Sequence, residues 1–292
     1  MTLEIPGFTT RRVPVADGVS LHAAVGGQGE PLVLLHGFPQ THLMWRHVAA
    51  DLARDRTVIC PDLRGYGASD KPPATGPETY AKRTMGADVV ALARALGFER
   101  FALAGHDRGA LVAFRTALDH ADAVTHLATL DVLPTLDMWD VLHGADAQVA
   151  WHLYLMAQPA GLPEAMIAAT ADTFFASFLD GWTGRPDAIV PDVRAEYLRA
   201  SREAVPSIVA DYRASAGIDL EHDRADRAQG RTLDMPTLVI QQDWGARLGY
   251  DAQALWGAWA TDLVHRTLAV GHFMAEESPG TVAAELRALL AR

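Results

Sequence analysis

The sequence predicts an α/β fold in which a mostly parallel β-sheet is covered by helices on both faces. Short apolar runs typical of buried strands alternate with segments of helical periodicity, as in doubly covered parallel sheets. This alternation is interrupted between about residues 134 and 234, where the pattern is helical and rich in Trp, Tyr, Phe and Met. We therefore expect a core domain of residues 1–133 and 235–292, with a helical cap of residues 134–234 inserted into it.

The individual elements follow from apolar runs and their periodicity. A two-strand entry is expected at 11–15 and 20–25, and the further strands are expected at 32–35, 57–60, 101–104, 126–130, 237–240 and 265–270. The expected helices lie near 42–54, 78–96, 108–120, 252–260 and 279–290. We interpret the charged run 221–227 as a solvated segment through which the chain leaves the cap.

Composition limits the possible partners. The net charge of −11 disfavours nucleic acid and anionic membrane surfaces. The single cysteine, Cys60, excludes an internal disulfide and a cysteine-based metal site. No apolar stretch approaches the roughly 18 residues of a membrane span. The first six residues lack a basic segment followed by an apolar one, so we expect a cytoplasmic protein.

The most informative motif is Gly105–Gly109, which has Asp107 at its centre. Glycines flanking a strand-to-helix turn permit the nucleophile-elbow geometry, which lifts the central side chain into a cleft. A carboxylate there is unsuited to cleaving esters or amides, because attack on an acyl carbon would form a labile anhydride. Displacement at an sp3 carbon instead gives an alkyl–aspartyl ester that water can hydrolyse. The motif therefore favours a carbon–halogen bond or an epoxide as the substrate.

Further candidate residues follow other expected strands, at the sheet edge where open parallel sheets bind ligands. The order Asp107, Asp131, His272 is that of nucleophile, acid and histidine in this hydrolase architecture. We expect His272 to activate water, Asp131 to orient the imidazole ring, and the Phe38 and Arg108 N–H groups to form an oxyanion hole.

Other polar motifs are interpreted as structural. We expect His36 to order its own loop and residues 62–70 to form a turn network. A metal site is not expected, since His42 and His47 have no carboxylate at ligand spacing, and the two-step chemistry needs no cofactor.

Residues 36–45, 105–109, 130–135 and 271–273 resemble the haloacetate (fluoroacetate) dehalogenases of the α/β-hydrolase superfamily, and the similarity runs over nearly the whole chain. The resemblance implies that Arg108 binds the substrate carboxylate and that His152 and Tyr212 donate hydrogen bonds to the departing halide. It also implies a small halogenated acid as substrate and a homodimeric protein. Donors aimed at a halide stabilise the charge that develops on it.

Two positions depart from the pattern of this family. Leu111 replaces a second arginine, and Leu153 replaces a tryptophan beside the cap histidine. These changes favour a chloro- or bromoacid, or a larger and less polar halide, over fluoroacetate.

Two alternatives remain open. An epoxide hydrolase would use the same Asp107 and His272, with Tyr212 and Tyr154 as proton donors and Asp243 as the acid. A non-catalytic binding module of the same fold is disfavoured, because such a module has no need of both Asp107 and His272.

Overall fold

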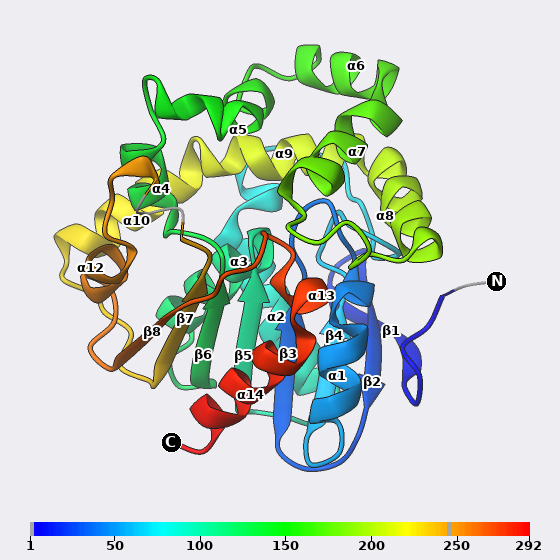
Figure 1. Cartoon of the computed structure of the whole chain (residues 1–292), viewed down its shortest axis with the longest axis vertical. Coiled ribbons are helices and arrows are strands. Elements are labelled where there is room, and N and C mark those ends of the chain that lie inside the picture. Colours follow the sequence, from blue (N-terminus) through cyan, green and yellow to red (C-terminus); the bar gives the residue numbers. More distant parts are fainter. Residues whose placement is uncertain (1–2, 244–246) are drawn as a thin grey trace.

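Within the residues that the structure describes, 3–243 and 247–292, eight strands form one sheet in the order β1-β2-β4-β3-β5-β6-β7-β8 (Figure 1). In this computed structural model β2 pairs antiparallel with both β1 and β4, and all other neighbours pair in parallel. The strands are β1 (Thr9–Ala16), β2 (Val19–Gly26), β3 (Pro31–Leu35), β4 (Thr57–Pro61), β5 (Phe101–His106), β6 (Val124–Leu130), β7 (Thr237–Gln241) and β8 (Leu263–Thr267). The predicted α/β class is confirmed.

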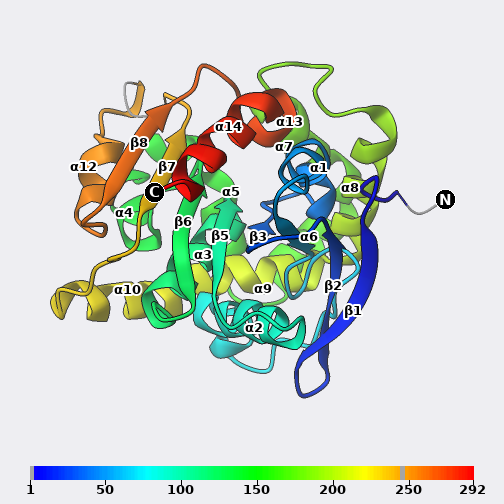
Figure 2. The same ribbon diagram turned by 90° about the horizontal axis from the view of Figure 1, so that it is seen from below.

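Helices cover both faces of the sheet (Figure 2). The core helices are α1 (Arg46–Leu52), α2 (Lys82–Ala95), α3 (Arg108–Asp119), α12 (Ala252–Gly257), α13 (Met274–Glu277) and α14 (Pro279–Leu290). Helices α2 and α3 pack together on one face, and α1 and α14 pack together on the other (Figure 2). Short 3-10 turns, η1 (His42–Trp45) and η2 (Pro77–Tyr80), precede α1 and α2, so each of these expected long helices is divided in two.

The sheet separates two apolar clusters. One lies on the α2 and α3 side and continues into the helices above the sheet, and the other lies beneath α1 and α14. Every residue of β5 is buried, as expected of a parallel strand covered on both faces. The site-bearing turn after β5 therefore starts from a rigid, fully packed strand.

A layer of helices lies over the carboxyl ends of the strands (Figure 1). It consists of α4 (Thr135–Val141), η3 (Asp146–Gln148), α5 (Trp151–Met156), α6 (Leu162–Ala169), α7 (Ala171–Trp182), α8 (Pro191–Glu203), α9 (Val205–Ser215) and α10 (Ile218–Ala228). These helices lie between β6 and β7 in the chain, where the sequence places the cap. The division into domains at residues 134 and 234 stays a prediction.

Two expectations about elements were wrong. The run 221–227 is not a solvated exit, because it lies in α10, where buried Asp223 and Asp226 both pair with Arg115 of α3. The last strand ends at Thr267 and not at 270, because its register with β7 runs only from Leu263 to Thr267.

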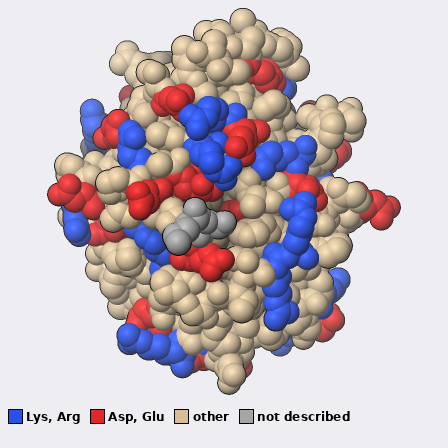
Figure 3. Space-filling view, turned by 90° about the vertical axis from the view of Figure 1, so that its right-hand side faces the viewer, with Lys and Arg blue, Asp and Glu red and all other residues tan. Residues whose placement is uncertain are grey.

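Charged side chains are prominent on the face shown in Figure 3. Lys and Arg side chains gather there in patches, with Asp and Glu side chains beside them. No helix in the described part of the chain has the length and apolar character needed to cross a membrane.

We predict that Arg115→Ala lowers the free energy of unfolding in urea by about 3–5 kcal/mol, because it leaves buried Asp223 without its cation. Arg194→Ala is the matched control, since Arg194 pairs with Asp180 at the surface, where such pairs contribute about 0–1 kcal/mol. Equal losses in the two variants would contradict a buried connection between α3 and α10.

Candidate active site

Asp107 occupies a sharp turn between β5 and α3. Its backbone has φ 49° and ψ −118°, a conformation that costs a non-glycine residue about 1–3 kcal/mol. A Cβ atom on Gly105 would lie 2.3 Å from the Gly109 carbonyl oxygen, and one on Gly109 would lie 2.4 Å from the His36 carbonyl oxygen. Both flanking positions therefore require glycine, and the turn has the geometry of a nucleophile elbow.

The two oxygens of the Asp107 carboxylate have different environments. Oδ1 accepts a hydrogen bond from the Phe38 N–H at 2.7 Å, whereas Oδ2 lies 4.0 Å from His272 Nε2. The other expected oxyanion donor is the backbone N–H of Arg108, the first residue of α3. Among the described residues, this N–H makes no hydrogen bond to Asp107. One oxygen is thus held by the backbone and the other faces the histidine.

Asp131 holds His272 in place. Asp131 follows β6 with φ 52°, and its Oδ2 lies 2.6 Å from His272 Nδ1. Gln242 donates to both carboxylate oxygens, from its backbone N–H at 3.0 Å and from its side-chain Nε2 at 2.7 Å. Asp243, the alternative acid, borders a separate surface groove. The carboxylate at the histidine is therefore Asp131.

The electrostatics of His272 suit a base. Burial lowers its pKa, but the hydrogen bond and charge of Asp131 and the charge of Asp107 outweigh burial and raise the pKa above its usual 6.5. Nε2 is buried with no hydrogen-bond partner in the described residues, and it faces Asp107.

His152 on α5 and Tyr212 on α9 both line the same cavity as Asp107 and His272. Tyr212 Oη and His152 Nδ1 are buried, with no hydrogen-bond partner among the described residues. Burial, with the nearby charge of Arg108, lowers the pKa of His152 to about 3, so the ring is neutral. Burial and the Asp107 charge raise the pKa of Tyr212, so its hydroxyl stays protonated. The cavity therefore contains two neutral groups with unused hydrogen-bonding capacity.

Arg108 is more constrained than the sequence indicates. Its Nε donates to Asp211 Oδ2 at 2.9 Å, and Nη2 donates to Asp211 Oδ1 at 2.9 Å, to the Asp211 carbonyl oxygen and to Ser215 Oγ. Lys82 and Tyr66 also bond to the Asp211 carboxylate. Among the side-chain nitrogens of Arg108, only Nη1 has no hydrogen-bond partner in the described part of the chain. The expected grip on a substrate carboxylate is therefore restricted to this one nitrogen.

Sequence reasoning assigned no role to Asp211. The only available signal was its place beside Tyr212 in a cap segment shared with the dehalogenases. Gln242, which binds Asp131, was also missed, because nothing in its residue type indicates a role in the site.

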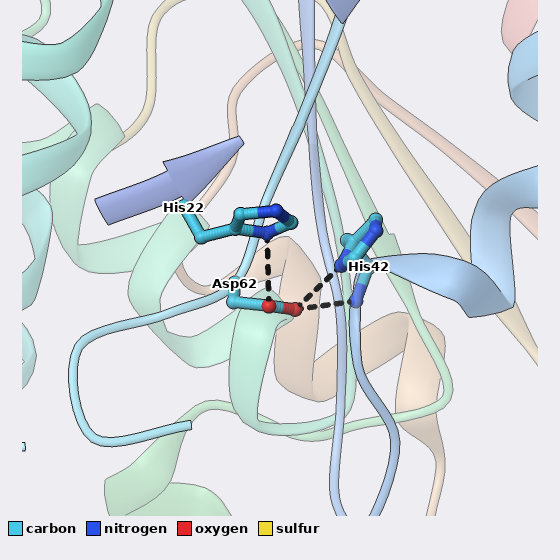
Figure 4. A group of neighbouring side chains, drawn as sticks. All are labelled: His22, His42 and Asp62. Carbon is cyan, nitrogen blue, oxygen red and sulfur yellow. Dashed lines mark hydrogen bonds and ion pairs between the residues drawn. The ribbon is translucent and has the colours of Figure 1, made fainter. Parts of the chain in front are cut away.

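His42 does have a carboxylate neighbour, contrary to the sequence analysis. His42 Nδ1 lies 2.8 Å from Asp62 Oδ1 and His22 Nδ1 lies 3.3 Å from Asp62 Oδ2, with both rings turned toward the carboxylate (Figure 4). The three ligand atoms lie within 4.8 Å of one another, so the group could hold a metal ion. Asp62 also accepts the His42 and Ala68 backbone N–H groups, each at 2.8 Å. These bonds fit the expected turn network, which supports the loop that carries Phe38.

One cavity of about 120 Å³ collects the candidate residues. The polar groups predicted from the sequence that line it are Asp107, Arg108, Asp131, His152, Tyr212 and His272. Leu111 and Leu153 line it as well, so both departures from the dehalogenase pattern face the site. Phe38 contributes its backbone N–H, and its ring packs against Tyr212 and His152, with centroids 5.3 and 6.1 Å away.

The chain is similar to known proteins over nearly its whole length. A family model of the α/β hydrolase fold matches residues 30–279. A fluoroacetate dehalogenase of Burkholderia is 42% identical over 97% of this chain and 94% of its own, and a soluble epoxide hydrolase of Corynebacterium is 31% identical over 92% and 93%. A crystal structure from Nostoc, assigned provisionally as an α/β hydrolase, superposes with a TM-score of 0.93 at 37% identity and covers 98% of this chain and 99% of its own. The chain therefore belongs to the haloacetate (fluoroacetate) dehalogenase family of the α/β-hydrolase superfamily.

Proposed function

We propose that this hydrolase removes halide from small haloacids in two steps. In the first step Asp107 Oδ2 attacks the carbon that bears the halogen, a carbon–oxygen bond forms, and the halide leaves with its electron pair. His152 and Tyr212 donate hydrogen bonds to the departing halide. The observation that supports this best is the asymmetric Asp107 carboxylate, with Oδ1 held by the Phe38 N–H and Oδ2 facing His272.

In the second step water cleaves the alkyl–aspartyl ester. Neutral His272 takes a proton from water at Nε2, and the water oxygen attacks Asp107 Cγ. The Phe38 and Arg108 N–H groups stabilise the charge on Oδ1, a contribution of about 3 kcal/mol for each donor. The bond between Cγ and Oδ2 then breaks, and Oδ2 takes the proton from His272 Nε2 and leaves as the hydroxyl oxygen of the product.

The epoxide hydrolase alternative is supported by the Corynebacterium relative and by the unpartnered Tyr212 hydroxyl. It is weakened at its second tyrosine, because the Tyr154 hydroxyl donates to the Leu142 carbonyl oxygen at 2.8 Å and Tyr154 does not line the cavity. Tyr250 is the other tyrosine in the cavity wall. In addition, a neutral epoxide has no carboxylate for Nη1 of Arg108 to bind.

The expected substrates separate these two functions. Halide should be released from chloro- and bromoacetate, and more slowly from fluoroacetate, while styrene oxide should give no diol. Halide release by ion chromatography and diol formation by gas chromatography measure the two reactions on one preparation. Diol formation without halide release would overturn the dehalogenase proposal.

The homodimeric state and the cytoplasmic location stay predictions.

His272→Ala should stop the reaction after its first step, because the base for ester hydrolysis is lost while the nucleophile remains. With chloroacetate, intact-protein mass spectrometry should show one carboxymethyl adduct, and peptide mapping should locate it on Asp107. Asp107→Asn is the control and should remain unmodified. An unmodified His272→Ala protein that retains its fold would argue against the covalent intermediate.

The pH dependence should follow His272, which acts as a base only when neutral. Asp131 is the largest cause that raises the pKa of His272, and it stays charged in the ester intermediate, so turnover should fall as the pH decreases through the pKa that His272 has there. Asp131→Asn removes the charge that raises the pKa, so the acidic limb should move to lower pH while the rate falls. Stopped-flow halide release should still show a burst at pH values where turnover is lost. An acidic limb at the same pH in Asp131→Asn would assign it to another group.

A further inference from the structure

The cavity lining combines polar groups with a wall of aliphatic side chains. The polar groups include Asp107, His272, the two candidate halide donors and Arg108. The wall is formed mainly by aliphatic side chains from α3, the loop after β6, α4 and α5, namely Leu111, Val132, Met138, Leu142 and Leu153. Haloacetate has a single methylene between its carboxylate and its halogen, so it offers nothing for this wall to bind.

The anchor for a carboxylate is correspondingly weak. Asp211 and Ser215 take up Nε and Nη2 of Arg108, which leaves Nη1. Leu111, one helical turn after Arg108, presents an aliphatic side chain to the cavity. A substrate held by one nitrogen needs additional binding energy from another part of the molecule.

We infer that the preferred substrates are 2-haloalkanoates whose α-carbon carries an alkyl chain that packs against the wall of Leu111, Val132, Met138, Leu142 and Leu153. This inference rests on the proposed dehalogenase function and adds the substrate class. With the carboxylate at Arg108 Nη1, the halogen at His152 and Tyr212 and Asp107 Oδ2 behind the α-carbon, two substituents remain, and the alkyl chain of one enantiomer is directed to the wall. Displacement by Oδ2 inverts the α-carbon, and hydrolysis at Cγ retains that inverted configuration in the 2-hydroxyalkanoate.

A series of secondary chlorides tests the inference. 2-Chloropropanoate, 2-chlorobutanoate and 2-chloropentanoate have the same reacting carbon and differ only by methylene groups, so their intrinsic reactivities are matched. Each buried methylene contributes about 0.8 kcal/mol, so kcat/KM should rise about fourfold per methylene. Halide release is measured for each enantiomer separately. A value of kcat/KM that is constant or falls along the series would overturn the inference.

Variants at Leu142 test whether this wall binds the alkyl chain of the substrate. Leu142→Phe should reduce the pentanoate-to-propanoate ratio of kcat/KM at least tenfold, and Leu142→Ala should shift the preference to longer chains. Leu155→Phe is the matched control, because Leu155 is a half-buried leucine outside the cavity lining, and it should leave the ratio unchanged. Unchanged ratios in both Leu142 variants, or equal changes in Leu155→Phe, would place the alkyl chain elsewhere.

Two further measurements test the anchor and separate the two levels of the proposal. Leu111→Arg should lower KM for chloroacetate and raise it for 2-chloropentanoate, and 1-chlorobutane should react more slowly than 2-chlorobutanoate. A faster reaction of 1-chlorobutane would overturn the carboxylate anchor.

Halide release from chloroacetate without a gain along the series refutes the inference alone. Absence of halide release from every haloacid, with diol formed from styrene oxide, refutes the proposed function and the inference with it.

Discussion

The buried ion pair between Arg108 and Asp211 joins the sheet domain to the helices above it. Arg108 is the first residue of α3, next to Asp107, and Asp211 lies on α9 next to Tyr212. The guanidinium carbon lies 4.1 Å from the centroid of the Tyr212 ring, so the ion pair also positions the tyrosine hydroxyl. A buried ion pair often adds little stability compared with apolar packing, because both charges must be desolvated. We therefore interpret its main effect as geometric, since it sets the proposed halide donor and the proposed carboxylate anchor relative to Asp107.

The two proposed catalytic carboxylates share a backbone constraint. Asp107 and Asp131 are the non-glycine residues with positive φ in the described chain, and they follow the neighbouring parallel strands β5 and β6. The Asp107 N–H donates to the Leu130 carbonyl oxygen at 3.0 Å, and the Asp131 N–H donates to the Ile240 carbonyl oxygen at 2.8 Å. Sheet hydrogen bonding thus extends to each aspartate before the chain turns. Buried strands hold both residues in a conformation that they would not adopt alone.

The parts of this site that could be predicted are those encoded locally. The elbow depends on two glycines within five residues, and the order of Asp107, Asp131 and His272 depends on strands that periodicity reveals. Ion pairs between distant segments leave no such pattern. Asp211 is 103 residues from Arg108, and Asp223 is 108 residues from Arg115, so the same carboxylates are equally compatible with solvent. The contact of His42 with Asp62 was missed for the same reason, since it depends on how a loop folds back onto the end of β4.

Charge on Asp107 connects the two chemical steps. While Asp107 is ionised, its charge is one of the causes that raise the pKa of His272 and favour the imidazolium form. Where the ring carries a proton, its charge offsets the repulsion between Asp107 and an anionic haloacid, which the net charge of −11 otherwise increases. Alkylation converts Asp107 into a neutral ester and removes that contribution, so the pKa of His272 falls and the ring loses its proton more readily. In the proposed mechanism, formation of the ester thereby prepares the base that hydrolyses it.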